Sequence, residues 1–253
     1  MTSETVIWKR TDMIRQGWER KYYLLFLRTL NRLYMQVSLK ITPDNVRSPE
    51  NLLSEITKEP IERAMLQLYI TVGAAFAQDT HSQYVKGNEQ LVDDWRARMA
   101  GYVKSHLAER LVSITGETRK QALRIMNRVL EAGIEGGEGI DVIARNMQKT
   151  LMRDGIQVNR FRATRIARTE IVNASNVGSL EGAKSLRMPM EKTWLATRDS
   201  RVRDSHQLVD GQTVMLEETF LVNGSNMQGP GDPDAPAEEV INCRCGLTYR
   251  VIR

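Results

Sequence analysis

The 253-residue chain has no apolar run that approaches the length of about 20 residues needed to cross a bilayer. Its longest apolar stretch, residues 22–27, lies between Lys21 and Arg28. The first residues, MTSETVIWKR, lack the basic start and the apolar core of a signal peptide. These absences predict a soluble protein that is made in a cytoplasm and has no membrane-spanning segment.

Cysteine is scarce. The chain has two cysteines, Cys243 and Cys245, which are separated by a single residue. A disulfide across one intervening residue would be strained, and a reducing compartment disfavours it. A disulfide-stapled fold is therefore not expected, and the pair needs another explanation.

Neither sign of charge dominates. The 36 lysines and arginines exceed the 31 aspartates and glutamates by enough to give a formal net charge of +5. An excess of this size permits contact with nucleic acid but does not require it. The hydrophobic share of 41% is ordinary for a folded globular chain, so a buried core is expected.

The larger part of the chain has helical periodicity. From residue 12 to about residue 182, apolar residues recur at three- and four-residue steps, which predicts amphipathic helices. Turn-forming residues interrupt the pattern at 41–49, and glycines interrupt it at 133–139. Thr115-Gly116 is interpreted as a further break, and Gly155 as a helix end.

Turn formers replace this periodicity after Gly182, and four of the seven prolines lie after residue 185. The segments between the turns are short and β-prone, so we interpret them as strands: Thr193–Leu195, Thr213–Leu216, Phe220–Val222 and Leu247–Ile252. The predicted fold class is α+β, with a mostly helical N-terminal region followed by a small loop-rich mixed α/β C-terminal module.

Three motifs follow one another in the second half of the chain. R-A-T-R-I-A-R-T-E-I-V-N-A-S-N-V-G occupies residues 162–178. Trp194 and T-R-D-S-R-V-R-D-S-H, residues 197–206, come next, and G-D-P-D-A-P-A-E-E-V-I-N-C-R-C-G-L occupies residues 231–247. This ordered set resembles the MuF-like family of minor head proteins of tailed bacteriophages, named after protein F of phage Mu. The resemblance covers roughly residues 115–250.

The resemblance implies a structural, non-enzymatic head-morphogenesis protein that acts in head assembly and in genome packaging or ejection. Its implied partners are the portal protein, other capsid or scaffold proteins and packaged DNA. Its implied location is the capsid interior of the virion, after assembly in the host cytoplasm. Residues 1–114, whose assignment rests on helical periodicity alone, would form a helical region that docks to the portal or another partner. Residues 115–182 would form the helical part of the MuF-like region. Residues 183–253 would form the small α+β module that ends in Asn-Cys-Arg-Cys.

The cysteine pair and one histidine suggest a metal site. Cys243, Cys245 and His206 carry ligand atoms that suit Zn²⁺, and Asp199 is a candidate fourth ligand. However, structural zinc sites usually space their cysteines further apart, and only three good ligands are visible. In the alternative interpretation, the cysteines pack as small hydrophobic residues and the histidine hydrogen-bonds a loop. Both interpretations stay open, and no cofactor other than zinc is expected.

The same residues allow an enzymatic alternative. His206, Cys243 and Cys245 could form a metal-dependent hydrolase or nuclease-like centre with an open position for water. Cys243 and His206 could also act as a nucleophile and its base. The sequence has no H-E-x-x-H motif and no glycine-rich phosphate loop, which weakens this alternative.

The run D-S-R-V-R-D-S-H predicts either an internal salt-bridge web or a solvated loop. If this segment is extended, Asp199, Arg201 and Arg203 all point to the same side, because every second side chain of a strand does so. Arginine pairs carboxylates with both of its terminal nitrogens, which would hold the loop in place. Asn242, beside the cysteines, could close a turn through its own backbone.

Four arginines lie on the helix that carries the first motif: Arg160, Arg162, Arg165 and Arg168. They could follow a phosphate backbone, pair with carboxylates of a partner, or stay solvated. Glu170 lies near the apolar side of this helix and, if buried, needs a partner such as Arg165 or Arg203. Small residues, among them Gly178, give the helix a side that another element can approach closely.

Overall fold

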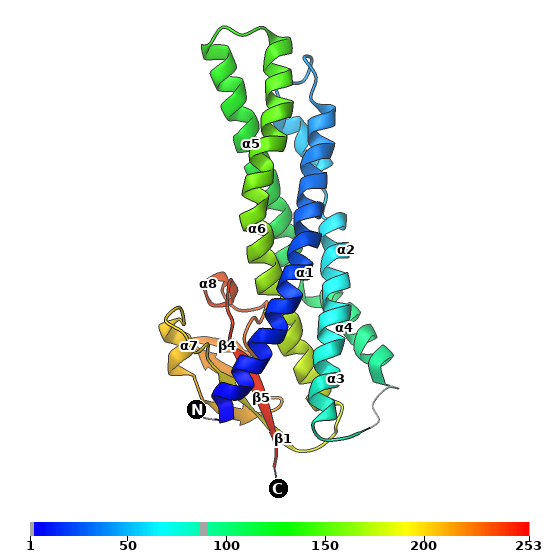
Figure 1. The fold of residues 1–253 in the computed structure, drawn as a ribbon, viewed down its shortest axis with the longest axis vertical. Helices are drawn as coiled ribbons and strands as arrows, with labels where there is room; N and C mark the ends of the chain where they lie inside the picture. Colours follow the sequence, from blue (N-terminus) through cyan, green and yellow to red (C-terminus); the bar gives the residue numbers. More distant parts are fainter. Residues whose placement is uncertain (1–2, 87–90, 253) are drawn as a thin grey trace. The chain divides into compact units, whose positions relative to one another are not determined.

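The computed structural model describes residues 3–86 and 91–252 and confirms the α+β fold, with long helices followed by a small region of antiparallel strands (Figure 1). The helical part consists of α1 (Ser3–Lys40), a 3-10 helix (Pro49–Glu55), α2 (Glu59–Leu68), a π-helical turn (Tyr69–Gly73), α3 (Ala74–Ser82), α4 (Val92–His106), α5 (Ala108–Glu135) and α6 (Ile140–Lys184). The C-terminal module, residues 190–252, contains β1 (Met190–Leu195), α7 (Asp204–Leu208), β2 (Thr213–Met215), β3 (Phe220–Val222), β4 (Ser225–Met227), α8 (Ala237–Val240) and β5 (Gly246–Val251).

The chain divides into two compact units, and each draws on separate stretches of sequence. We call residues 23–64 and 108–164 the helical unit, and residues 1–22, 65–107 and 165–253 the mixed unit. Helices α1 and α6 each run through both units. The units therefore do not coincide with the regions 1–114, 115–182 and 183–253 that were predicted from the sequence.

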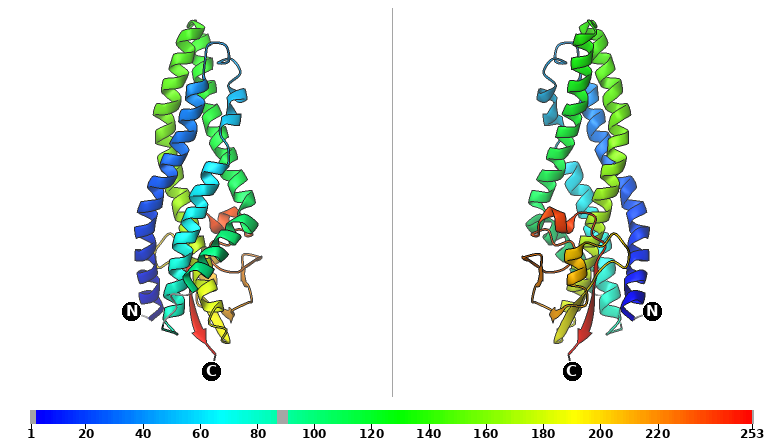
Figure 2. Two further views of the ribbon diagram at one scale, coloured as in Figure 1. Left: turned by 90° about the vertical axis from the view of Figure 1, so that its right-hand side faces the viewer. Right: turned by 90° about the vertical axis from the view of Figure 1, so that its left-hand side faces the viewer.

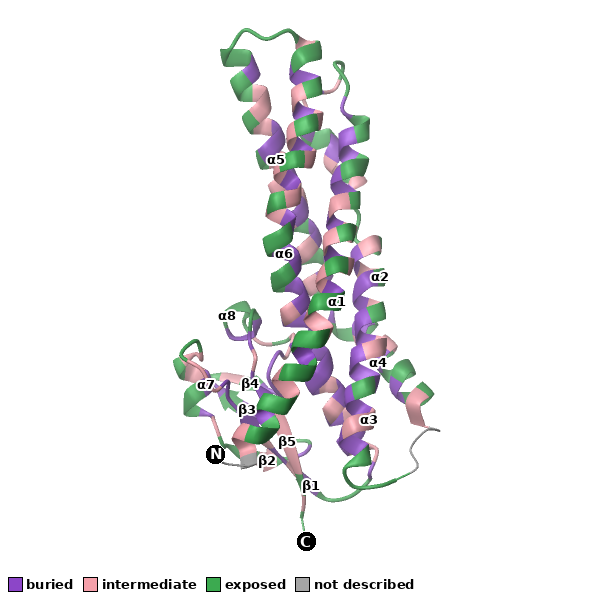
Figure 3. Ribbon diagram, in the orientation of Figure 1, coloured by how far each residue is buried: buried purple, intermediate pink, exposed green. Residues whose placement is uncertain are grey.

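The helical unit is organised by apolar stripes. In α1 the side chains of Phe26, Leu30, Tyr34 and Val37 are buried, at steps of three and four residues, while the opposite side is exposed (Figure 3). The Tyr34 hydroxyl donates a hydrogen bond to the Thr118 carbonyl of α5 at 3.2 Å. None of the described helices is both long enough and apolar enough to span a bilayer.

Two helix breaks predicted from the sequence are wrong. Helix α5 continues through Thr115-Gly116, where the Thr115 hydroxyl donates to the Leu111 carbonyl of its own helix at 2.7 Å. Helix α6 continues through Gly155, and both views of Figure 2 show it as one unbroken helix. A Cβ at Gly155 would lie 2.3 Å from the Tyr34 ring, so this glycine serves packing between helices and does not end one. A single glycine costs a helix only about 1 kcal/mol, which tertiary packing overcomes.

In the mixed unit, glycines of α6 allow another helix to approach, as the small residues of this helix predicted. A Cβ at Gly178 would lie 2.1 Å from the Gly73 carbonyl oxygen, and one at Gly182 would lie 2.3 Å from that of Ala77. These contacts hold the π-helical turn and α3 directly against the backbone of α6.

The C-terminal module contains a three-stranded antiparallel sheet in the order β2-β1-β5 and a separate β3-β4 hairpin. Four of the predicted strand segments coincide with β1, β2, β3 and β5, whereas β4 and the short helices α7 and α8 were not predicted. Asn223 and Gly224 form the hairpin turn with φ values of 48° and 80°. Positive φ at both central residues is the requirement that makes Asn-Gly a favoured hairpin turn.

Candidate functional site

His206 of the second motif and the two cysteines of the third motif meet inside the C-terminal module. Helix α7 supplies His206, and the segment between α8 and β5 supplies Cys243 and Cys245. The imidazole Nδ1 of His206 lies 3.6 Å from Cys243 Sγ and 3.4 Å from Cys245 Sγ. The histidine is 1% exposed and each cysteine 2%, so the group is closed to solvent.

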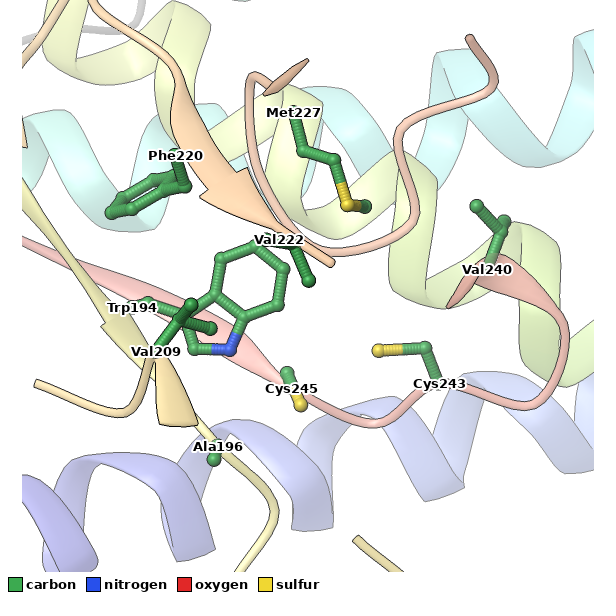
Figure 4. Close-up of a cluster of buried hydrophobic side chains, with 9 residues drawn as sticks. All are labelled: Trp194, Ala196, Val209, Phe220, Val222, Met227, Val240, Cys243 and Cys245. Atoms are coloured by element: carbon green, nitrogen blue, oxygen red, sulfur yellow. The ribbon is translucent and has the colours of Figure 1, made fainter. Parts of the chain in front are cut away.

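Trp194 of β1 forms one wall of this group. It is fully buried, with its ring edge-to-face against His206 at 5.3 Å between centroids and against Phe220 at 5.4 Å. Figure 4 shows it beside the two cysteines in the apolar cluster of the module, with the indole nitrogen facing Cys245. Among the described residues, that indole N–H has no hydrogen-bond partner.

Glu239 of α8, which the sequence interpretation missed, lies behind the histidine. Its Oε2 is 3.0 Å from His206 Nε2. The carboxylate also accepts hydrogen bonds from the Ser205 hydroxyl at 2.8 Å and from the Asn223 amide at 2.9 Å. Burial opposes its ionisation, but these hydrogen bonds and the neighbouring His206 and Arg203 side chains outweigh burial and lower the pKa of Glu239. The carboxylate lies within reach of Nε2, although the two are not aligned as a hydrogen bond, while Nδ1 lies on the side of the sulfur atoms.

The two thiols influence each other. A hydrogen bond with Cys243 lowers the pKa of Cys245 well below its ordinary value, and a hydrogen bond to His206 acts in the same direction. The same interaction between the cysteines, together with burial, raises the pKa of Cys243. The pKa values of the two thiols are thus shifted in opposite directions.

Asp199, the candidate fourth ligand, is not brought into this group. Both of its oxygens accept hydrogen bonds from Arg244, at 2.5 and 2.9 Å, in the two-pronged geometry that favours arginine over lysine. These hydrogen bonds hold the pKa of Asp199 down at about 2. Arg201 also contacts Asp199 but is 73% exposed, and Arg203 donates to the Ile241 carbonyl. The loop is therefore anchored by the arginine of the Asn-Cys-Arg-Cys segment.

Arg15 of α1 is a second residue that the sequence interpretation missed. It is 2% exposed and donates hydrogen bonds to Ser175 Oγ and Asn176 Oδ1 of α6, each at 2.7 Å, and to the Cys245 carbonyl at 2.9 Å. Burial lowers the pKa of Arg15 to about 10. Trp8, seven residues before Arg15 on α1, donates from its indole to the Arg244 carbonyl at 3.1 Å. Helix α1 is thereby fastened to the Asn-Cys-Arg-Cys segment.

The Ala-Arg-Thr-Glu motif of α6 makes the remaining contacts of this network. Thr169 Oγ1 accepts a hydrogen bond from the backbone N–H of Asn242 at 3.1 Å. Asn242 has a φ of 59°, in the left-handed region that asparagine tolerates in turns. Glu170 is buried and accepts a hydrogen bond from the Tyr69 hydroxyl at 2.8 Å, whereas the sequence suggested Arg165 or Arg203 as its partner.

The four arginines of α6 have different surroundings. Arg162 is 6% exposed and donates to Thr118 Oγ1 at 2.8 Å and to the Ile114 carbonyl at 3.1 Å, which places it inside the helical unit and not on a binding surface. Arg168 is paired with Glu19 at 3.3 Å. Arg160 and Arg165 are exposed, so these two remain accessible to a phosphate or a partner.

Two cavities are lined by residues that are near His206 or the cysteines along the chain. Neither cavity is lined by His206 or by a cysteine. One, of 580 Å³, is lined by loop residues that include Asp199, Asp204 and Asp210. The other, of 250 Å³, lies between α4, α6 and the segment around Pro230. The closed sulfur and imidazole group therefore has no opening to either of these cavities.

Comparison with known proteins places this site in a family. Residues 124–248 match the family described as Phage Mu protein F like protein. This match confirms the resemblance drawn from the motifs for residues 124–248.

Two relatives match comparable lengths of the chain. The minor head protein GP7 of Bacillus phage SPP1 is 28% identical over 145 residues, which are 55% of this chain and 45% of that protein. The NAD(+)--arginine ADP-ribosyltransferase EFV of Enterococcus faecalis is 33% identical over 127 residues, 49% of this chain and 25% of that protein. The chain thus spans less than half the length of either relative, and no solved structure matches it. The family and the phage relative support a structural role in a phage head.

Proposed function

We propose that this protein is a structural minor component of a tailed-phage head, bound with the portal protein and DNA inside the capsid. In this role it acts in head assembly and in genome packaging or ejection. The observation that carries the proposal is the use of the family motifs for internal packing. Thr169, Asn242 and the cysteines contact other parts of the protein, so the motifs build a fold that can dock.

The enzymatic alternative has less support. A hydrolase built on His206, Cys243 and Cys245 needs a path for water and substrate, but these side chains are 1–2% exposed. The similarity to an ADP-ribosyltransferase involves a quarter of that protein, so three quarters of it have no counterpart in the match. A segment of similar length matches a minor head protein as well, which favours a shared structural module over a shared catalytic one.

The proposal is tested in a phage that encodes this chain. Purified, nuclease-treated particles are analysed by quantitative mass spectrometry, with the major capsid protein as the reference for copy number. We expect the chain at low copy number and protected from added protease until the heads are opened. Its absence from particles would remove the head role, and digestion in intact heads would remove the interior location.

Portal association is tested separately, because it is a finer claim. A tagged portal protein from the same phage is purified from infected cells, and we expect it to retain the chain. An unrelated tagged structural protein of the phage serves as the control. If particles contain the chain but the tagged portal does not retain it, the head role stands and the portal contact is excluded.

A further inference from the structure

The distances within the buried sulfur and imidazole group match the geometry of a tetrahedral zinc ion. Zinc bonds of about 2.3 Å to sulfur and about 2.05 Å to nitrogen, at a tetrahedral angle, separate the two ligand atoms by about 3.6 Å. The observed separations from His206 Nδ1 are 3.6 Å to Cys243 Sγ and 3.4 Å to Cys245 Sγ. All three ligand atoms lie within 4.8 Å of one another, and within the described part of the chain no other histidine, cysteine or carboxylate joins the group.

The surroundings of the histidine also match a metal ligand. Metal-bound histidines almost always direct their second ring nitrogen to a carboxylate, a carbonyl or a water, which fixes the ring and raises its basicity. Here the second nitrogen lies 3.0 Å from Glu239, although not aligned as a hydrogen bond, and Glu239 is itself held by Ser205 and Asn223. This arrangement aims Nδ1 at the two sulfurs. A histidine that only filled a loop would not need so firmly held a carboxylate.

Trp194 supplies an independent observation. Its indole N–H is buried without a partner among the described residues, and Figure 4 shows it facing the cysteine side chains. An unmet buried donor costs about 1–3 kcal/mol, so such a group usually indicates an acceptor that is bound at the site. A metal-bound thiolate or a water on the metal would be that acceptor.

The charges of such a site balance. Two thiolates and one Zn²⁺ sum to zero, so binding would place no net charge in the apolar cluster around Trp194 and Phe220. The ion would join α7 to the start of β5, which are separated by more than thirty residues of loops and short elements. A small, loop-rich region gains most from such a staple.

We propose that His206, Cys243 and Cys245 bind one zinc ion that stabilises the C-terminal module, with the fourth position filled by a water molecule. Glu239 is a positioning residue that holds His206 and does not contact the ion. The site is structural, because its ligands are closed to solvent. This inference does not depend on the proposed role in a phage head.

The test uses the full chain without a histidine tag, purified under reducing conditions and reconstituted with zinc. Bound metal is measured by elemental analysis for wild type, Cys243→Ser, His206→Ala and the matched control Asp199→Asn, which removes a neighbouring carboxylate that is not a ligand. We expect about one zinc per chain in wild type and the control, and a loss of zinc in the two ligand variants. Wild type that stays folded and binds no zinc would overturn the proposal, as would full zinc binding by His206→Ala.

A second measurement on wild type covers the case in which the ligand variants fail to fold. Cobalt replaces zinc in the chelator-treated protein, and we expect a thiolate-to-cobalt charge-transfer band with the intense visible bands of a tetrahedral site. Glu239→Gln is expected to weaken zinc binding about 10–100-fold without changing the stoichiometry or the cobalt spectrum. A cobalt spectrum without sulfur ligation, or a melting temperature that does not rise when zinc is returned, would contradict the proposal.

Discussion

The helical unit and the mixed unit share two long helices, but different interactions stabilise them. In the helical unit, apolar stripes on α1, α5 and α6 face one another, and the polar links that accompany them, from Tyr34 and Arg162, converge on Thr118. In the mixed unit, buried polar groups connect parts of the chain that are far apart in sequence. Arg15 meets Cys245 across 230 residues, and Thr169 meets Asn242 across 73. Apolar stripes tolerate small changes in register, whereas these polar links specify one arrangement.

The largest effect predicted from this comparison is that of Arg15→Met, which keeps the volume of the side chain and removes its donors. Three buried acceptors, on Ser175, Asn176 and Cys245, lose a charged partner. Because hydrogen bonds to charged groups contribute about 1.5–3 kcal/mol each and are not additive, we expect a loss of about 3 kcal/mol in the free energy of unfolding.

Tryptophan fluorescence can follow this loss in one unit, because Trp8, Trp18, Trp95 and Trp194 all lie in the mixed unit. The midpoint of the urea transition followed by fluorescence should fall. The midpoint of the helical transition of the other unit, followed by circular dichroism, should fall less. Arg10→Met, at a position that is 63% exposed, is the control and should cost less than about 1 kcal/mol. An equal shift of both signals would show that the two units unfold together and that the comparison fails.

The next effect concerns the close contacts of α6. Gly178→Ala places a methyl group 2.1 Å from the Gly73 carbonyl oxygen, where backbone must move. We expect a loss of about 1–3 kcal/mol, by the cost of overpacking a close-packed contact. The control is Gly116→Ala in α5, where a Cβ meets nothing within 4 Å and helix propensity should add about 1 kcal/mol of stability. Thermal unfolding should show a lower melting temperature for Gly178→Ala and a higher one for Gly116→Ala. Equal changes in melting temperature would contradict the packing explanation.

Asp199 gives a smaller, pH-dependent effect. Arg244 lowers its pKa from 3.8 to about 2, so the folded state gains stability that is present above the unfolded value and is lost as the pH falls from 3.8 toward 2. Since the carboxylate is 30% exposed, solvent screening reduces the contribution to about 1 kcal/mol. Asp199→Asn should lower the stability by this amount at neutral pH and by progressively less as the pH falls through 2, as measured by urea unfolding at neutral pH and in this acid range. A deficit that persists in acid would point to lost packing instead.

The elements that could be predicted from the sequence are those whose cause is local. Apolar spacing predicted the helices, and turn residues around short β-prone segments predicted four strands. The strand β4 was missed although Asn223-Gly224, between two short β-prone segments, is a local hairpin signal. Arg15 and Glu239 could not be predicted in the same way, because nothing near them in the sequence indicates which distant groups they meet. The helix breaks at Thr115-Gly116 and Gly155 were predicted from local propensity and failed because contacts between helices overrode it.

The smallest predicted effect on stability belongs to the exposed arginines of α6. Replacing Arg160 and Arg165 by alanine should change the free energy of unfolding by less than about 0.5 kcal/mol, because neither side chain is buried. If both contact phosphates, the slope of log affinity for duplex DNA against log salt should fall in magnitude by about 2, since each neutralised phosphate contributes about 0.9.

Lys149→Ala, at an exposed position of the same helix, is the matched control for this slope. An equal change for the control would reveal a general electrostatic attraction and not a defined contact. An unchanged slope in the double variant would indicate that the two arginines do not contact DNA. Their binding to a protein partner can then be tested by repeating the portal experiment with this variant. Because stability is unaffected in either case, this measurement separates docking from folding, which variants of the buried polar network cannot do.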